Sequence, residues 1–119
     1  MTHLELRQRT QGYAVAVAEF AQGRDGHLAG RHAAAQLVRA SASVAANYRA
    51  AGVARSHKEF IAKLGVVIEE ADECVFWLEY IEATTVPTGP DLAALKDEAQ
   101  QLLRIFASSR STARRNSRR

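Results

Sequence analysis

The chain of 119 residues carries 16 Lys or Arg against 13 Asp or Glu, and 47% of its residues are hydrophobic. This length and apolar fraction suit one folded domain and exclude wholesale disorder. The single cysteine excludes an internal disulfide framework and a cysteine-based zinc site. No signal-like segment or apolar run of roughly 20 residues is present, so the sequence predicts a cytoplasmic protein that does not enter a membrane.

The first half of the chain contains two segments in which apolar residues recur every three or four positions. This period is typical of a helix that buries one face. The first predicted helix covers residues 4–22 and the second covers residues 28–52. Their predicted core faces consist of Leu6, Thr10, Tyr13, Val17 and Phe20, and of Ala34, Leu37, Ser41, Val44, Tyr48 and Ala51.

The second half of the chain repeats the same pattern twice. Ser56 and Glu59 match a capping box at the start of a predicted helix over residues 57–84. Pro90 suits the first turn of a predicted helix over residues 90–108. The predicted core faces are Phe60, Leu64, Val67, Ala71, Cys74, Leu78 and Ile81, and Leu92, Leu95, Ala99, Leu102 and Phe106.

Four helices joined by short loops predict an all-α fold, an antiparallel up-down-up-down four-helix bundle. We assign residues 1–109 to this bundle domain. The last ten residues, RSTARRNSRR, contain five arginines, no acid and almost nothing apolar. This composition predicts that residues 110–119 form a disordered arginine-rich tail.

The predicted third helix carries more apolar side chains than a monomeric bundle needs. A helix that is hydrophobic on nearly every side is normally buried on nearly every side. We therefore predict an oligomer interface, whereas the alternative is that interhelical loops cover this surface. The interface residues are Ile61, Ile68, Val75, Phe76, Trp77 and Tyr80.

The predicted second helix carries a row of arginines on its outer, alanine-rich face. Guanidinium groups pair well with phosphates, so the row predicts contact with an RNA or DNA backbone. The alternative is that these arginines pair with acids of the third or fourth helix, within or between subunits, in a protein-interaction scaffold. The predicted nucleic-acid-binding residues are Arg31, Arg39 and Arg49 of the row, Arg55 and Lys58 at the following corner, and Arg114 and Arg115 of the tail.

Residues 43–82 resemble a known protein family. The segments SVAANYRAA, ARSHKEFIAKLG and EEADE followed by FWLE resemble the central signature of the four-helix bundle proteins first associated with intervening sequences in bacterial 23S rRNA genes. The segment LRQRTQGYAVAVAEF also fits that family. Two features depart from the family pattern: the loop GRDGHLAG lacks the usual proline, and the arginine-rich tail is additional.

The resemblance implies an oligomer that binds other macromolecules. Members resemble the accessory protein of diversity-generating retroelements, a barrel-shaped homopentamer with a basic surface that binds reverse transcriptase and nucleic acid. By this resemblance we expect a homopentamer whose partner is RNA, DNA or a protein. Most members have no assigned activity, so the resemblance implies no chemistry.

The sequence offers no catalytic or cofactor-binding pattern. A di-metal site in a helical bundle needs Glu-x-x-His pairs, and none of the thirteen acidic residues has a histidine three positions later. The four histidines form no metal-binding motif. Cys74 lies on a predicted core face, where a thiol behaves as a small hydrophobe. We therefore predict that the protein is not an enzyme and holds no cofactor or metal.

Overall fold

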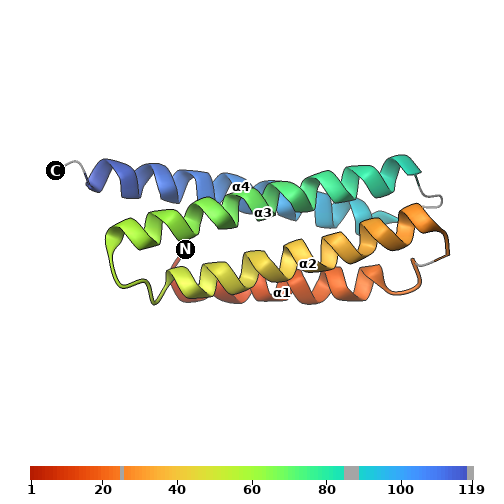
Figure 1. Cartoon of the computed structure of the whole chain (residues 1–119), viewed down its shortest axis with the longest axis horizontal. Helices are drawn as coiled ribbons and strands as arrows, with labels where there is room; N and C mark the ends of the chain where they lie inside the picture. Colours follow the sequence, from red (N-terminus) through yellow and green to blue (C-terminus); the bar gives the residue numbers. More distant parts are fainter. Residues whose placement is uncertain (25, 85–88, 118–119) are drawn as a thin grey trace.

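The computed structural model describes residues 1–24, 26–84 and 89–117, and within them the chain is an all-α bundle. The four helices are α1 (His3–Ala21), α2 (Leu28–Ala51), α3 (His57–Thr84) and α4 (Pro90–Asn116). Each helix runs in the opposite direction to the one before it, so both ends of the chain lie at one end of an elongated molecule of 52 × 23 × 20 Å (Figure 1). The predicted fold class is confirmed.

Three of the helices are capped at their N-termini by a side chain that accepts a hydrogen bond from a backbone amide of the first turn. Thr2 and Glu5 form a reciprocal capping box at α1, and the His27 ring accepts from the Gly30 amide at α2. At α3 the Ser56 hydroxyl accepts from the Glu59 amide at 3.0 Å, which is half of the capping box that the sequence predicted. Helix α4 starts instead with Pro90 after Gly89, because proline loses nothing where the amide would be unpaired.

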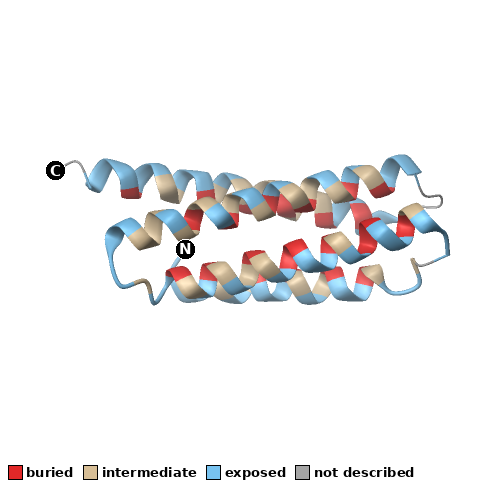
Figure 2. Ribbon diagram, in the orientation of Figure 1, coloured by how far each residue is buried: buried red, intermediate tan, exposed pale blue. Residues whose placement is uncertain are grey.

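The core lies along the faces that the helices turn toward one another (Figure 2). Every predicted core-face residue is buried except Phe60, which is half-buried and packs against the core. The largest fully buried side chains come from all four helices and include Val17, Leu37, Leu78 and Phe106. Helices α2 and α3 share the most extensive contact, whereas α1 and α4 touch only sparsely.

Polar groups hold the sparse contact between α1 and α4. The Arg9 guanidinium donates to both carboxylate oxygens of Glu98, at 2.7 and 2.6 Å, and to the Gln101 side chain at 3.0 Å. Beneath them, the buried Tyr13 hydroxyl donates to the Leu95 carbonyl at 3.1 Å. Burial raises the pKa of Tyr13, so its proton stays in place for this bond.

The C-terminal segment corrects the sequence prediction. Helix α4 continues to Asn116, whereas the sequence ended it at 108 and predicted disorder from 110. The core face recurs one heptad after Phe106, at Ala113, which is buried. Arginine is also a good helix former, so an arginine-rich composition does not stop a helix that still has a side to bury.

The ends of α3 and α4 are joined by a side-chain contact. His57 Nε2 lies 2.7 Å from the carbonyl oxygen of Ala113, near the C-terminal end of α4. The same oxygen accepts from the Ser117 amide at 3.1 Å. The contact with His57 fixes the last turns of α4 against the start of α3. In the described part of the chain, no helix is long and apolar enough to cross a membrane.

Candidate nucleic-acid interface

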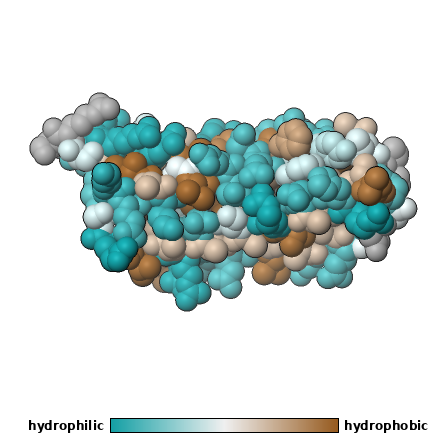
Figure 3. Space-filling model, in the orientation of Figure 1, coloured by the Kyte–Doolittle hydropathy of each residue, from teal (hydrophilic) through white to brown (hydrophobic). Residues whose placement is uncertain are grey.

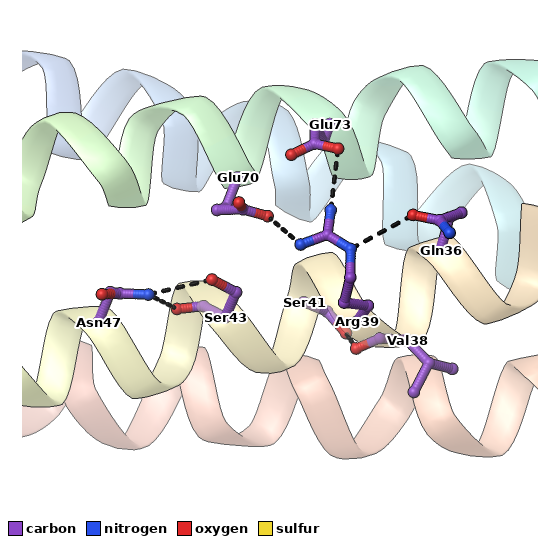
Figure 4. Close-up of polar contacts among 8 residues, drawn as sticks. All are labelled: Gln36, Val38, Arg39, Ser41, Ser43, Asn47, Glu70 and Glu73. Atoms are coloured by element: carbon purple, nitrogen blue, oxygen red, sulfur yellow. Dashed lines mark hydrogen bonds and ion pairs between the residues drawn. The ribbon is translucent and has the colours of Figure 1, made fainter.

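The central arginine of the predicted row is neutralised within the chain. Arg39 of α2 donates to Glu70 at 3.1 Å and Glu73 at 2.9 Å, both on α3, and to Gln36 on its own helix (Figure 4). Burial, reinforced by repulsion from Glu73, raises the pKa of the Glu70 carboxyl despite the nearby arginine. Arg39 therefore follows the alternative that the sequence left open, an ion pair within the subunit.

The neighbouring polar residues of α2 also bond within their own helix. The Asn47 amide donates to the carbonyl and hydroxyl oxygens of Ser43, at 2.9 and 3.0 Å. The Ser41 hydroxyl donates to the Val38 carbonyl at 3.1 Å. These bonds satisfy polar groups on a packed helix and leave no set of donors aimed at a ligand.

The two outer arginines of the row differ from the central one. Arg31 and Arg49 are exposed, and neither pairs with a carboxylate in the described part of the chain. They lie about 27 Å apart along α2, at 1.5 Å per residue. Each lines a separate hollow between α1 and α2, so they do not form one continuous ladder.

A denser group of cations lies at the end of the molecule where α2, α3 and α4 meet. We call this group the basic pole, and it comprises Arg55, Lys58, Arg110, Arg114 and Arg115. The bond between His57 and Ala113 brings the start of α3 and the last turns of α4 together at this end (Figure 1). Four of the seven predicted nucleic-acid-binding residues therefore gather here.

Few acids compensate the basic pole. The only ion pair of a pole residue among the described residues joins Arg55 to Glu59 at 3.4 Å, with the Arg55 side chain 90% exposed. The imbalance extends to the whole half-molecule around the pole. Residues 1–12, 40–70 and 103–117 carry ten Lys or Arg and four Asp or Glu, whereas residues 13–24, 26–39, 71–84 and 89–102 carry four and eight.

The corner between α2 and α3 is built closely onto the start of α1. The His3 ring stacks on Tyr48 and bonds to its hydroxyl at 3.0 Å. The same ring lies against Gly52, where any Cβ atom would collide with it. Gly52 therefore serves a close approach of two chain segments, and this corner holds the basic pole in place.

The predicted interface residues of α3 are partly exposed, with Ile61, Ile68 and Val75 on one side of the helix and Trp77 and Tyr80 on the other. Phe76 is 54% exposed, while Ile61, Ile68, Val75, Trp77 and Tyr80 are half-buried along the helix. Phe76, Trp77 and Tyr80 contact one another, and His32 of α2 packs edge-on against Trp77. In the described part of the chain, the buried Trp77 Nε1 has no hydrogen-bond partner. The alternative that loops cover this surface depends in part on residues 25 and 85–88, which lie outside the described residues.

Neither a metal-binding cluster nor an accessible thiol is found among the described residues. They contain no group of three or more His, Cys, Asp or Glu placed to hold a metal ion. Cys74 is fully buried, and burial raises the pKa of its thiol to about 12, reinforced by Glu70 and Glu73. A thiol in this setting is protonated at neutral pH and is a poor nucleophile.

Sequence reasoning missed two parts of this surface. Arg110 was assigned to the tail, and the signal that could have placed it on α4 was the heptad from Phe106 to Ala113. The hollows between α1 and α2 were also missed, although the alanine floor of α2 was visible. Their depth depends on how α1 packs against α2, which the spacing within one helix does not give.

Comparisons with known proteins agree on the family and the fold. Residues 2–108 match the family model described as 23S rRNA-intervening sequence protein. A solved structure from Bacteroides thetaiotaomicron, a protein with unknown function from the S23 ribosomal protein family, is similar with a TM-score of 0.82. The two share 22% identity over 93% of this chain and 99% of the other, so the likeness shows the fold alone. The comparison with curated proteins gave no match. Since the family model spans nearly the whole chain, the protein belongs to the 23S rRNA-intervening sequence protein family.

Proposed function

We propose that this protein is a non-enzymatic, oligomeric four-helix bundle that binds nucleic acid, free or in a nucleoprotein, through the basic pole. The observation that carries the proposal is the charge separation along the molecule. Five cations crowd one end, and among the described residues Glu59 is the only carboxylate that pairs with any of them, while Arg115 also donates to the Thr112 hydroxyl. Exposed and largely unpartnered guanidinium and ammonium groups bind phosphates by releasing counterions.

The composition of the pole favours contact with the backbone over recognition of bases. Phe60 is half-buried and already stacks with the His57 ring, while Tyr48 and Phe106 lie in the core. With no exposed Phe, Tyr or Trp ring among its described residues, the pole lacks the large platforms on which unpaired bases stack best. We therefore expect binding that varies little with sequence and falls steeply with salt.

A pair of double variants tests this proposal. R114Q/R115Q removes two charges from the basic pole, and R24Q/R31Q removes two charges from the opposite half of the molecule. Binding of a fluorescent RNA hairpin is measured by anisotropy across a salt series. We expect R114Q/R115Q to weaken binding about tenfold or more at low salt and to reduce the slope of log K against log salt by about 1 to 2.

The control variant separates a site from a general charge effect. R24Q/R31Q should keep both the affinity and the salt slope of the wild type. Equal losses for the two variants would show that net charge alone drives binding and would overturn the pole as a site. Unchanged affinity in R55Q/K58Q/R114Q/R115Q would reject nucleic-acid binding by this surface altogether.

We propose that the oligomer forms through the predicted interface residues of α3 and is the homopentamer expected from the family resemblance. The support is the exposure of Phe76 and Val66, 54% and 38%, beside four half-buried apolar side chains that pack on the core. Light scattering after size-exclusion chromatography should find an oligomer that Phe76→Glu reduces in size. Val53→Glu, at a residue that is 78% exposed in the α2–α3 corner, is the matched control. A monomeric wild type would contradict the proposal.

One specific observation favours the alternative that the protein is a protein-interaction scaffold. Arg31 and Arg49 have no carboxylate partner in the described part of the chain, so a partner molecule could supply one. If they form salt bridges between subunits, R31Q/R49Q should lower the oligomer's dissociation midpoint and leave RNA affinity unchanged. If the oligomer keeps its midpoint in this variant, the scaffold alternative fails.

A further inference from the structure

The outer crevice between α1 and α2 contains two hollows in line. One has a volume of about 400 Å³ and lies between Arg7 on α1 and Arg49 on α2 at one end and Ala18 at the other. The next, of about 360 Å³, continues from Ala21 to Arg24 and Arg31. Helices α1 and α2 run antiparallel, so Arg7 of α1 and Arg49 of α2 lie at one end of this crevice, and Arg31 of α2 lies at the other with Arg24, which follows α1. We call the two hollows together the α1–α2 groove.

The middle of the groove is apolar. Alanines form most of its floor, and Val15 and Val38 stand 54% and 37% exposed beside them. In the space-filling view, weakly hydrophobic side chains follow the lower edge of the molecule, where α1 and α2 lie (Figure 3). Among the residues that the structure describes, no carboxylate lines either hollow. The surface is therefore apolar in the middle and positively charged at both ends.

The arginines at the ends are available to a partner. Arg7, Arg31 and Arg49 form no ion pair within the described part of the chain. Arg24 lies over the Phe20 ring, 3.8 Å from its centroid, and its guanidinium bonds only the Phe20 carbonyl among the described residues. Four cations without carboxylate partners at two separated points favour a ligand with negative charge at two separated points.

We propose that the α1–α2 groove binds an acidic amphipathic helix of a partner protein. A floor of alanines lets a third helix approach closely and pack its side chains between the ridges of α1 and α2. The span from Arg31 to Arg49 is eighteen residues of α2, which is five turns. The partner helix therefore carries carboxylates about eighteen residues apart on one face, with small apolar residues at helical spacing between them.

Two other occupants fit the groove less well. A nucleic-acid backbone would place phosphates over alanine methyl groups along the apolar middle, where the lining offers few donors. A second copy of this chain would have to offer an acidic helix of matching pattern. The exposed acids of α3, the most acidic helix of this chain, are Glu69, Asp72, Glu79 and Glu82. They span about 20 Å, which is shorter than the distance of about 27 Å between Arg31 and Arg49, and have Phe76 among them.

Synthetic helices test the charge spacing directly. The probe is a fluorescein-labelled peptide, held helical by a hydrocarbon staple, with glutamates eighteen residues apart on one face and Ala or Leu between them. A second peptide of the same composition carries both glutamates on the opposite face. In anisotropy titrations we expect the first peptide to bind the full-length protein about tenfold more tightly than the second.

Substitutions in the protein test the place of binding. R7Q/R49Q should weaken binding of the first peptide about tenfold. Ala42→Lys, which adds positive charge but blocks the floor of the groove, should weaken it at least as much. R114Q/R115Q removes the same charge from the basic pole and should leave peptide binding unchanged while it weakens RNA binding. Helicity and the thermal midpoint confirm that each variant is folded.

Several results would overturn the proposal. Equal binding of the two peptides, or equal loss in R7Q/R49Q and R114Q/R115Q, would mean that only net charge attracts acidic helices. Tighter binding by Ala42→Lys would show that the floor of the groove plays no part. A change in sedimentation of Ala42→Lys toward smaller species would assign the groove to a second copy of this chain. R114Q/R115Q tests RNA binding by the basic pole, whereas R7Q/R49Q tests peptide binding by the groove. Failure of one proposal is therefore distinguishable from failure of the other.

Discussion

At the scale of single residues, Arg39 links α2 to α3 by compensating two acids that lie close together. Because Arg39 is 47% exposed, we expect Arg39→Gln to lower the free energy of unfolding by about 1 kcal/mol at neutral pH, the value of two partly exposed ion pairs. The variant leaves Glu70 and Glu73 uncompensated. Urea unfolding at a series of pH values measures this deficit in the free energy of unfolding.

The pH dependence of this deficit has a definite sign. The pKa of Glu70 is raised in the fold by burial and by Glu73, so its contribution to stability is complete at low pH and is lost as the carboxyl ionises. Removing Arg39 raises that pKa further, so the deficit of Arg39→Gln should shrink as the pH falls and the carboxyl becomes protonated. Arg31→Gln on the same helix is the control and should cost less than about 0.5 kcal/mol at any pH. A deficit that grows in acid would contradict this account.

Cys74 gives a second prediction at this scale. The thiol is fully buried and its pKa is raised to about 12, so the reactive thiolate is scarce and inaccessible in the folded protein. At mildly alkaline pH we expect labelling by a disulfide reagent to be on the order of 100-fold slower in the native protein than in denaturant. Comparable rates in the two states would show that this part of the core opens readily.

At the scale of helices, the last turns of α4 are where composition and periodicity gave different predictions. Ala113→Gly should lower the free energy of unfolding by about 1 kcal/mol or more, because it removes both helix propensity and a buried methyl group. Ser111→Gly, at an exposed position on the same turn, should cost about half as much or less. Thermal unfolding followed by circular dichroism measures both. Equal small effects would mean that residues 110–116 form the disordered tail that the composition predicted.

The sequence was sufficient for the helices because their pattern is local. Residues such as Val17, Leu64 and Leu102 repeat at helical spacing, and a helix that buries one face must place them inside. The bounds of α1, α2 and α3 lie within one residue of those expected. The end of α4 was missed because Ala113 is a lone small residue among arginines and serines.

The candidate site could be predicted from the sequence only in part, because it depends on contacts between helices. Arg39 lies on the exposed side of α2, as the sequence predicted, but its pairing with Glu70 depends on the register of α2 against α3. The basic pole depends on the bond between His57 and Ala113, two residues that lie 56 positions apart. Spacing along one helix carries no information about either contact.

At the scale of the whole molecule, the sparse contact between α1 and α4 is the weakest side of the bundle. A side of the bundle where the two helices make few close contacts has low local stability. Native-state hydrogen exchange should therefore find lower protection in α1 than in α2 and α3. Arg9→Gln should lower the protection of α1 further and leave that of α3 unchanged. Protection in α1 equal to the highest in the protein would contradict this expectation.

The same contact has a consequence for how the protein is made. Arg9 meets Glu98 across 89 positions of chain, so α1 leaves the ribosome long before its partner helix exists. Local pairing of α2 with α3 has no such delay, since loop closure over a short corner is rapid. During synthesis, α1 therefore packs against α4 only after α2 and α3 have been made.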